Sequence, residues 1–348
     1  MEEHYQRERI SCPLCGADRH EIFLDNVKER YNDMDEWFDI VSCLNCGFIF
    51  TNPRPTPATI GYFYPNSAGY YAPKPERTTS WATGPGLKNR LLRAVAAREF
   101  GYPFAEQLPA ALTTLVRPWL LNKLLISHLP RHTPGGRLLD IGCSWGGYLI
   151  RMRELGWEVH GVELNEEAAR HAREQLGLDN VHTGFFDTLD YAGGFFDVIH
   201  MGMVLEHLFN PREALVTING LLKNGGQLIL SVPDISGLEV RLFRDRCYTL
   251  HVPQHLSHFT PQTLTRLLEE TGFRVERIVH QKSKKDFLKS AEYMRESFLA
   301  RLLLSFPVRK LLLGPLVTIL AALGKTSRMS VRASKTADTA SLSGGNRI

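Results

Sequence analysis

The sequence lacks the features of a membrane-spanning, secreted or disordered chain. No uninterrupted apolar run reaches the ~20 residues that cross a bilayer. The first ten residues are rich in charge and have no apolar core, so they do not match a secretory signal. Six cysteines in 348 residues are too few for a disulfide scaffold. Hydrophobic residues make up 43% and charged residues 22%, so we expect a globular protein of the reducing cytoplasm.

Charge is unevenly distributed along the chain. From Arg274 to the end there are 15 Lys/Arg and 5 Asp/Glu, whereas residues 1–60 contain 6 basic and 11 acidic residues. A basic tail on a mildly acidic body indicates a local anionic partner, such as a small ligand or the inner face of a membrane. The acidic N-terminal region argues against a nucleic-acid partner, and we expect none.

Four of the six cysteines form two CxxC pairs near the N-terminus. Cys12 and Cys15 make the first pair, Cys43 and Cys46 the second, and a glycine follows each pair. Each pair places two thiolates on one tight turn, and four sulfurs complete a tetrahedron around zinc. We therefore predict a structural Zn²⁺ site in a small domain over residues 1–60. Four reduced core cysteines, or two redox-active pairs, remain alternatives.

Residues 61–130 begin with a segment rich in tyrosine and proline. The prolines exclude a regular helix or a central strand there. The segment is either a linker with packed aromatics or a lid that lays tyrosines over a ligand site. From residue 87 onward, Leu and Ala recur at helical spacing and predict a small helical cap, divided by Pro103, Pro109 and Pro118.

From residue 131 to 282 the pattern alternates between strands and helices of about ten residues. This alternation predicts an α/β fold with a doubly wound, mostly parallel sheet. Strands are expected at 137–142, 157–162, near 181, 195–200, 227–232 and 274–280, and helices at 146–155, 166–176, 211–222 and 260–271.

The last quarter, residues 283–335, reads as a helical, apolar and basic insertion followed by one more strand at 328–334. Its longest uncharged run, 311–323, is too short to span a bilayer. An amphipathic helix with a basic face can lie in the membrane interface. A helical cap or a dimer contact is the alternative explanation of the pattern. Residues 336–348 are predicted to be a disordered tail.

A glycine-rich turn follows the first strand of the alternation. Asp140, Gly142 and Gly146 lie where that strand meets its helix, which is where doubly wound folds bind ligands. Glycines there let the backbone approach a ligand closely. The spacing matches neither the dinucleotide fingerprint GxGxxG nor a P-loop.

Two carboxylates and an aromatic pair continue this candidate nucleoside site. Glu163 ends the second strand, where a carboxylate can accept hydrogen bonds from both ribose hydroxyls. Asp187 follows the third strand, where it can meet the exocyclic amine of adenine. Phe185 or Phe186 is placed to pack against the ring.

These motifs together resemble the class I S-adenosylmethionine-dependent methyltransferases. The matching pieces run in order along the chain: Leu138-Leu-Asp-Ile-Gly-Cys-x-x-Gly-Gly, Val159-x-Gly-Val-Glu163, Phe185-x-Asp187, Phe196-Asp-Val-Ile, Leu205-Glu-His207-Leu-x-Asn-Pro211 and Leu222-Lys-x-Gly-Gly226. The resemblance implies a Rossmann-like, seven-stranded sheet, with residues 328–334 as an antiparallel seventh strand. It also implies S-adenosylmethionine as cofactor. Ser144 stands where the family usually has a third glycine.

The zinc pairs extend the resemblance to a subgroup with an N-terminal zinc-binding domain, which includes sugar C-methyltransferases. In that subgroup a tyrosine-bearing segment after the zinc domain covers the site. The resemblance makes Tyr64, Tyr70 and Tyr71 the lid candidates. It implies methyl transfer to a small molecule, expected to be a sugar or a glycolipid or polysaccharide precursor.

Three clustered histidines supply candidates for the general base. His251, His255 and His258 follow the fifth strand, and histidine is the usual base near neutral pH. In the sugar-methylating relatives a Glu-His pair lies at the position of Gln254 and His255. We predict His255 as the base, with Gln254 orienting the substrate.

The other histidines receive secondary roles. His258 is expected to be structural or a cap partner for the helix near residue 260. His207 is expected to border the substrate, or else to cap a helix. Binding of a divalent cation by the three clustered histidines is an alternative, which Pro253 disfavours because it argues against a helix there.

Three functions are compatible with the sequence. The first is methylation of a small or lipid-linked sugar at an oxygen or carbon atom. The second is methylation of RNA or protein with the zinc module as reader, although Met201-Gly-Met-Val stands where amino-group methyltransferases carry Asn/Asp-Pro-Pro-Tyr. The third is a non-catalytic binding module on a degenerate fold.

Overall fold

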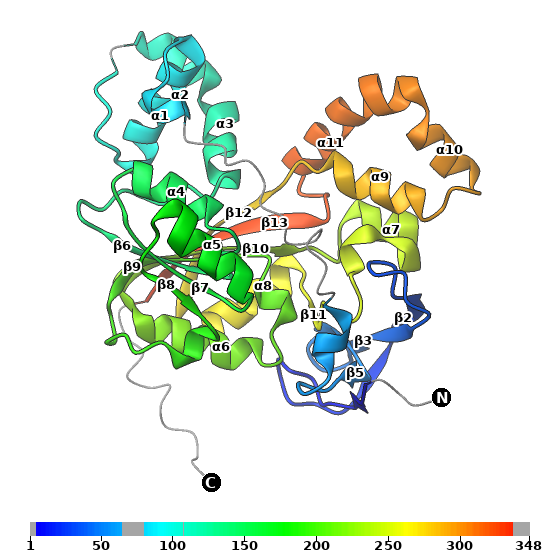
Figure 1. Cartoon of the computed structure of the whole chain (residues 1–348). Helices are drawn as coiled ribbons and strands as arrows, with labels where there is room; N and C mark the ends of the chain where they lie inside the picture. Colours follow the sequence, from blue (N-terminus) through cyan, green and yellow to red (C-terminus); the bar gives the residue numbers. More distant parts are fainter. Residues whose placement is uncertain (1–4, 65–79, 107, 337–348) are drawn as a thin grey trace.

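A central sheet flanked by helices forms the body of the protein, with a cysteine-rich sheet packed beside it and two helical groups projecting from it (Figure 1). The computed structural model describes residues 5–64, 80–106 and 108–336. The lid candidates Tyr70 and Tyr71, and all but Thr336 of the predicted disordered tail, lie outside the described residues.

The central sheet has seven strands in the order β12-β13-β10-β9-β6-β7-β8. All pairings are parallel except those of β13, which runs antiparallel to both β10 and β12. The predicted fold class is therefore confirmed, including the antiparallel strand near the C-terminus. The strands are β6 (Arg137–Ile141), β7 (Glu158–Glu163), β8 (Val181–Thr183), β9 (Phe196–Gly202), β10 (Leu222–Pro233), β12 (Phe273–His280) and β13 (Arg328–Lys335).

Consecutive side chains of β6 point to opposite faces of this sheet and join different hydrophobic clusters. Leu139 packs on the face covered by α6 and α8, while Leu138 packs on the face covered by α4 and α5. These helices are α4 (Gly147–Glu154), α5 (Glu166–Leu176), α6 (Pro211–Leu221) and α8 (Pro261–Glu270).

Local capping fixes where these helices begin. The side chain of Asn165 accepts a hydrogen bond from the backbone N–H of Ala168 at the start of α5. At α8, Thr260 and Thr263 form a reciprocal capping box. The predicted role of His258 as a cap partner is therefore wrong, because the Thr260–Thr263 pair already supplies the cap.

The cysteine-rich region forms a second sheet in the order β11-β4-β3-β2. Its strands are β2 (His20–Lys28), β3 (Trp37–Cys43), β4 (Ile49–Thr51) and β11 (Ser257–His258), and β1 (Arg7–Glu8) pairs separately with β5 (Arg54–Pro55). Strand β11 comes from the segment that follows the central strand β10. Phe48 and Phe50 pack in the same hydrophobic cluster as α6 and α8. Because β11 pairs with β4, the cysteine-rich sheet joins the first 60 residues to the segment that follows β10.

The predicted helical cap consists of α1 (Ser80–Thr83), α2 (Leu87–Phe100) and α3 (Ala110–Ile126). Pro118 lies inside α3 and does not divide it, contrary to the expectation. A proline inside a helix costs about 3 kcal/mol. Leu120 and Leu124 of α3 are buried in the cluster that also holds Leu92 of α2, and this packing offsets the lost hydrogen bond.

The second helical group follows β12 and lies beside α7 (Figure 1). Its buried residues, such as Phe287 and Leu313, share a cluster with Phe38 of β3. No helix among the described residues has the length and apolar character required to cross a bilayer. The elements are α7 (Leu238–Phe243), α9 (Lys284–Glu292), α10 (Phe298–Leu304), a π-helical turn η6 (Val308–Leu312) and α11 (Leu313–Ala322).

Candidate active site

The predicted glycine turn lies at the carboxyl end of β6. The backbone N–H groups of Gly142 and Cys143 both donate to the carbonyl oxygen of Val162, at 2.8 and 3.1 Å. Ser144, the departure from the family pattern, has φ +50°. This left-handed conformation is unusual for a residue with a side chain, so the serine keeps the backbone shape that a glycine would adopt.

Two glycines of the turn have no room for a side chain. A Cβ on Gly142 would lie 2.6 Å from Cγ2 of Val204, and a Cβ on Gly146 would lie 2.7 Å from Cδ1 of Leu178. Gly146 also has φ +87°, which disfavours any L-residue. Close packing and backbone conformation therefore both require glycine at position 146.

Glu163 ends β7 with its carboxylate fixed beside this turn. One oxygen accepts the backbone N–H of Ser144 at 2.8 Å, and the other accepts that of Asn165 at 2.9 Å. The residue is only 9% exposed. Each oxygen keeps a further lone pair for a ligand, so the geometry fits a pair of ribose hydroxyls. Its role in cofactor binding stays a prediction.

Asp187 and the aromatic pair lie on the same edge of the sheet. Phe186 and Asp187 belong to the turn η2 (Phe186–Thr188) after β8, and Phe185 precedes it. The N–H of Gly184 donates to the carbonyl oxygen of Glu163 at 3.0 Å. Phe185 is 61% exposed, whereas Phe186 is partly buried against the core. Phe185 is thus the more available ring for a ligand, and Asp187 is exposed.

Asp140 belongs to a buried chain of polar side chains that sequence reasoning missed. Its Oδ1 lies 2.6 Å from Nδ1 of His200, and Nε2 of His200 lies 2.7 Å from Nδ1 of His128. Nε2 of His128 then lies 2.8 Å from Oγ of Ser330 on β13. The only available signal was that His200 falls on the strand next to β6, where the register pairs it with Asp140.

The hydrogen bonds of this chain depend on the tautomers of the two histidines. If each Nδ1 carries the proton, His200 donates to Asp140, His128 donates to His200, and Ser330 donates to His128. Burial lowers the pKa of His128 well below its usual value, which keeps that ring uncharged. Asp140 is therefore oriented from within the sheet, and its predicted contact with the cofactor remains untested.

The second half of the site is assembled where three distant segments meet. His207 ends the turn η3 (Leu205–His207) after β9, and His255 precedes β11. Their rings lie edge to face with centroids 4.7 Å apart. The backbone N–H of Leu256 donates to the carbonyl oxygen of Glu206 at 2.9 Å, which ties the two segments together.

Tyr64 and Gln254 complete this cluster. Oη of Tyr64 lies 3.0 Å from Nδ1 of His207, and the same nitrogen lies 2.9 Å from the carbonyl oxygen of Gln254. The Gln254 amide in turn donates to the carbonyl oxygen of Phe63 at 2.9 Å. The structure therefore brings together Tyr64, His207, Gln254 and His255, four of the residues that the sequence nominated for the acceptor side.

Burial controls the protonation of both histidines. His255 is 3% exposed, and burial lowers its pKa well below the usual value. Burial also lowers the pKa of His207, to about 4. Both rings are accordingly neutral at pH 7 and present a lone pair. The role of His255 as a base stays a prediction.

His258 points away from this cluster. Its Nε2 lies 3.2 Å from Oγ1 of Thr51, and its backbone belongs to β11, which pairs with β4. His251, by contrast, stacks on His255 with ring centroids 4.9 Å apart. The three clustered histidines thus do not converge on one point, and the structure does not support a metal site made of these three.

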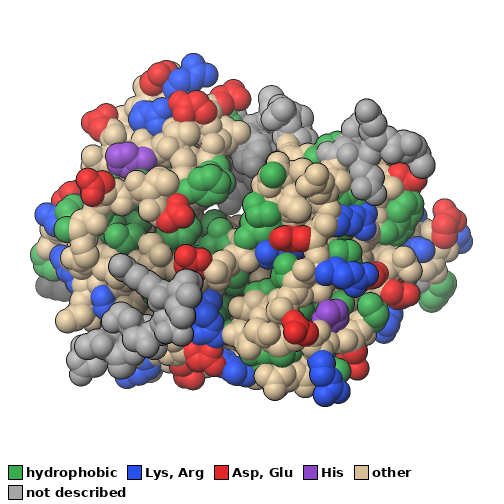
Figure 2. Space-filling model, turned by 90° about the horizontal axis from the view of Figure 1, so that it is seen from below, with side chains coloured by type: hydrophobic (Ala, Val, Ile, Leu, Met, Phe, Trp, Pro, Cys, Tyr) green, Lys and Arg blue, Asp and Glu red, His purple; other side chains and the backbone are tan. Residues whose placement is uncertain are grey.

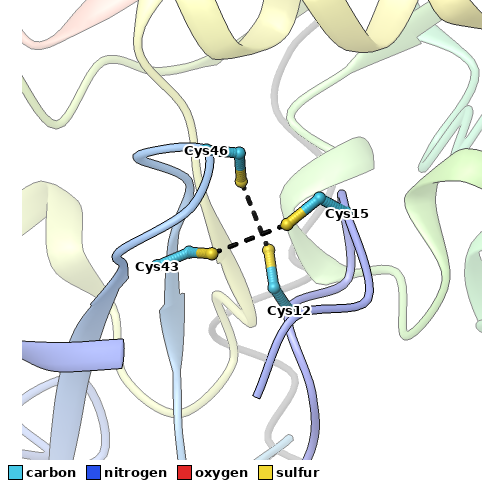
Figure 3. A group of neighbouring side chains, drawn as sticks. All are labelled: Cys12, Cys15, Cys43 and Cys46. Carbon is cyan, nitrogen blue, oxygen red and sulfur yellow. Dashed lines mark hydrogen bonds between the residues drawn. The ribbon is translucent and has the colours of Figure 1, made fainter. Parts of the chain in front are cut away.

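The four predicted zinc ligands converge on one point (Figure 3). Sγ of Cys12 lies 3.5 Å from Sγ of Cys46, and Sγ of Cys15 lies 3.6 Å from Sγ of Cys43. All four sulfurs lie within 4.8 Å of one another. Sulfurs bound tetrahedrally to zinc at about 2.3 Å are about 3.8 Å apart, so this arrangement fits the ion.

Glycines shape the two turns that carry these sulfurs. Gly16 and Gly47 follow the pairs with φ +74° and +72°. Their N–H groups donate to the carbonyl oxygens of Cys12 and Cys43 at 2.8 and 2.9 Å. Both turns therefore have the same hydrogen-bonding pattern, which is what two matching halves of one metal site require.

Comparison with known proteins finds relatives of the central part of the chain. Residues 108–278 match a family model described as a methyltransferase domain. The ubiquinone biosynthesis O-methyltransferase of Ruegeria sp. (strain TM1040) is 35% identical over 152 residues, which cover 40% of this chain and 60% of that enzyme. An uncharacterized 37.1 kDa protein in transposon TN4556 of Streptomyces fradiae is 31% identical over 157 residues, 42% of this chain and 46% of that protein.

These alignments span about half the length of the curated relatives. Among solved structures, the geranyl diphosphate C-methyltransferase of Streptomyces coelicolor A3(2) superposes with a TM-score of 0.43 and 16% sequence identity, over 68% of this chain and 87% of that enzyme. The match shows that residues 108–278 are similar to a methyltransferase domain.

Proposed function

We propose that the class I methyltransferase domain of residues 108–278 transfers a methyl group from S-adenosylmethionine to a small-molecule acceptor, a sugar or a lipid-linked sugar precursor. The observation that carries this proposal is the carboxylate of Glu163, held by the N–H groups of Ser144 and Asn165 beside the glycine turn. S-adenosylmethionine would supply an electrophilic methyl group there.

The chain's own residues divide the work between two sides. Asp140, Glu163 and Asp187 lie on β6, on β7 and after β8, and would hold the nucleoside and amino-acid parts of the cofactor. Tyr64, His207 and His255 would face the acceptor. Val204, two residues before Glu206, contacts Gly142 in the glycine turn that would bind the cofactor, called the cofactor turn below. The acceptor cluster of Tyr64, His207 and His255 therefore adjoins this turn.

The acceptor atom is proposed from chemistry and from the relatives. The two neutral imidazoles can accept a proton from a hydroxyl or from an activated carbon. The ubiquinone-biosynthesis relative is an O-methyltransferase, which favours an oxygen acceptor. The sugar class rests on the resemblance of the paired cysteines and the tyrosine segment to sugar methyltransferases, and a structural Zn²⁺ at Cys12, Cys15, Cys43 and Cys46 belongs to the same proposal.

An exposed apolar surface on α10, η6 and α11 supports the lipid-linked version. These elements project from the body of the molecule (Figure 1). Between residues 297 and 325 there are four basic residues, all exposed, and no acidic residue. Exposed apolar and basic side chains in one segment match an anionic lipid surface. The apolar surface consists of Phe298, Leu302, Phe306, Leu311, Leu312, Leu316, Ile319 and Leu323.

A radiolabel experiment tests the proposal. Purified protein is incubated with methyl-labelled S-adenosylmethionine and an extract of host cells, and the label is then divided into organic, small aqueous and macromolecular fractions. Label in the organic fraction supports a lipid-linked acceptor, and label in the small aqueous pool supports a free sugar derivative. Label on RNA or protein would replace the proposed acceptor class, and absence of both label and cofactor binding would leave only a binding module.

Surface charge supports the choice of a small acceptor over nucleic acid. On the face seen in Figure 2, basic and acidic side chains are interspersed among the described residues. A protein that reads a nucleic acid usually presents a continuous basic patch. The mixture on this face, together with the acidic composition of residues 1–60, favours a small acceptor.

A further inference from the structure

Three side chains with metal-binding atoms meet beside the cofactor turn. Glu206 and His207 come from η3, and His255 comes from the segment before β11. One ligand atom of each lies within 4.8 Å of the other two. This group differs from the three clustered histidines, and neither the zinc site nor the proposed cofactor contacts involve Glu206.

The hydrogen bonds of the two histidines fix which nitrogen is free. Nδ1 of His255 lies 3.1 Å from the carbonyl oxygen of Thr249, and Nδ1 of His207 lies 2.9 Å from that of Gln254. A carbonyl oxygen only accepts, so each Nδ1 carries the proton and each Nε2 keeps its lone pair. Metal-binding histidines are usually oriented in this way, with the second nitrogen donating to a carbonyl or carboxylate.

Glu206 adds a buried carboxylate that has no hydrogen-bond donor among the described residues. The residue has no exposed surface, and neither carboxylate oxygen receives a hydrogen bond from the described residues. Oε1 lies 4.0 Å from Nε2 of His255, which is too long for a hydrogen bond. Arg328, the nearby cation, is held by Asp286 through contacts of 2.6 and 3.1 Å.

A buried carboxylate in these surroundings needs a positive partner. Burying an unpaired charge away from water is strongly unfavourable. A proton on Glu206 would satisfy one oxygen at most. A cation would satisfy the carboxylate and the imidazole nitrogens at once, because the three residues offer ligand atoms within 4.8 Å of one another.

We infer that Glu206, His207 and His255 bind a divalent first-row transition-metal cation at the acceptor side of the site. Two imidazoles and one carboxylate form a donor set that suits such ions. Ligand atoms about 2.1 Å from a tetrahedral ion are about 3.4 Å apart, so closing the group from its limit of 4.8 Å requires a pair of ligand atoms to approach by at most about 1.4 Å. The ion's identity within this class would depend on availability.

The inference deepens the proposed function and rests on it for its purpose. A cation at this point would supply a Lewis acid for an oxygen of the acceptor. His255 would then serve as a ligand and not as the base predicted from the sequence. Whether a metal binds is independent of methyl transfer, so the two proposals can fail separately.

Cobalt binding to the zinc-loaded protein tests the inference. Zinc first fills the four-cysteine site, and Co²⁺ is then titrated while visible absorption is recorded. We expect one saturable Co²⁺ whose d–d bands lack thiolate-to-cobalt charge transfer. Glu206→Gln and His255→Gln should each weaken Co²⁺ binding by about tenfold or more. No saturable binding by the wild-type protein, or equal binding by the variants, would overturn the inference.

Two controls separate loss of the site from loss of the fold. Glu239→Gln changes another buried carboxylate that lies outside the group, and it should leave Co²⁺ binding unchanged. Calorimetric titration with S-adenosylmethionine reports on the proposed function by itself. If the wild-type protein binds Co²⁺ at Glu206 but does not bind S-adenosylmethionine, the metal site stands and the proposed function fails.

Discussion

Oγ1 of Thr51 donates a hydrogen bond to the backbone carbonyl oxygen of His255 at 2.9 Å. The bond joins β4 of the cysteine-rich sheet to the segment that carries the predicted base, 204 residues later in the chain. The N–H of Thr51 also donates to the carbonyl oxygen of Leu256 at 3.0 Å. The cysteine-rich region thus packs against the segment that carries His255, and its integrity should affect chemistry at the proposed acceptor site.

Removing one of the four proposed zinc ligands should therefore reduce methyl transfer more than cofactor binding. In Cys43→Ser we expect zinc content measured by mass spectrometry to fall, together with a lower Tm. Because Cys43 ends the strand β3 that pairs with β4, the position of His255 should become less defined. The affinity for S-adenosylmethionine should change little.

Cys247→Ser is the matched control for this experiment. Cys247 is a buried free thiol outside the metal group. The Cys247→Ser protein should therefore retain its zinc. If Cys43→Ser retained both zinc and activity, the structural role assigned to the four-cysteine site would be wrong.

Glu163→Gln should weaken binding of S-adenosylmethionine. The charged carboxylate is the proposed acceptor for both ribose hydroxyls, and hydrogen bonds to charged groups contribute about 1.5–3 kcal/mol, which corresponds to roughly 10- to 150-fold in affinity. Isothermal titration calorimetry measures the change directly. Glu158→Gln, at the opposite end of β7, serves as the control. Equal affinities for the wild-type protein and Glu163→Gln would exclude the ribose assignment.

Acid should destabilise the protein partly through His258. Burial lowers the pKa of this histidine to about 3, whereas the unfolded chain has a value of about 6.5. Between these values the unfolded state binds a proton that the native state does not. The contribution of the neutral His258 to the free energy of unfolding is therefore complete above pH 6.5 and is lost as the pH falls toward 3.

Replacing His258 should make the free energy of unfolding less dependent on pH in this window. In His258→Gln, unfolding no longer takes up a proton at this position. The slope of the free energy of unfolding against pH should therefore decrease by about 1.4 kcal/mol per pH unit. Urea unfolding between pH 4 and 6 gives the slopes. His182→Gln, an exposed histidine on β8, is the control. An unchanged slope in His258→Gln would mean that this ring is not buried as a neutral group.

The exposed apolar surface should bind anionic vesicles. We expect the protein to sediment with vesicles that contain phosphatidylglycerol and to remain in the supernatant with pure phosphatidylcholine, since the surface combines apolar and basic side chains. The double variant Leu311→Asp/Leu312→Asp should lose sedimentation, because both side chains are more than 60% exposed. Leu115→Asp changes a side chain on α3 that is 80% exposed and should have no effect.

Much of the fold was predictable because its signals are local. The alternation of apolar runs with helical spacing predicted the order of strands and helices, and α5 matches its expected range of 166–176. Glycines and paired cysteines predicted the two tight turns and the cofactor turn. Pro118 shows the limit of such signals, because burial of the neighbouring leucines outweighs the local tendency of proline to end a helix.

The sequence by itself determined the elements, the four-sulfur site and most residues beside the cofactor turn. Only the tertiary structure decided that His200 meets Asp140, that Thr51 anchors His255, and that Glu206 is buried against two imidazoles. The physical reason is the separation along the chain of the residues that make contact. Turns and periodicity involve residues a few positions apart, whereas these contacts join segments separated by about 50 to 200 residues and depend on strand register and on how loops close over the core.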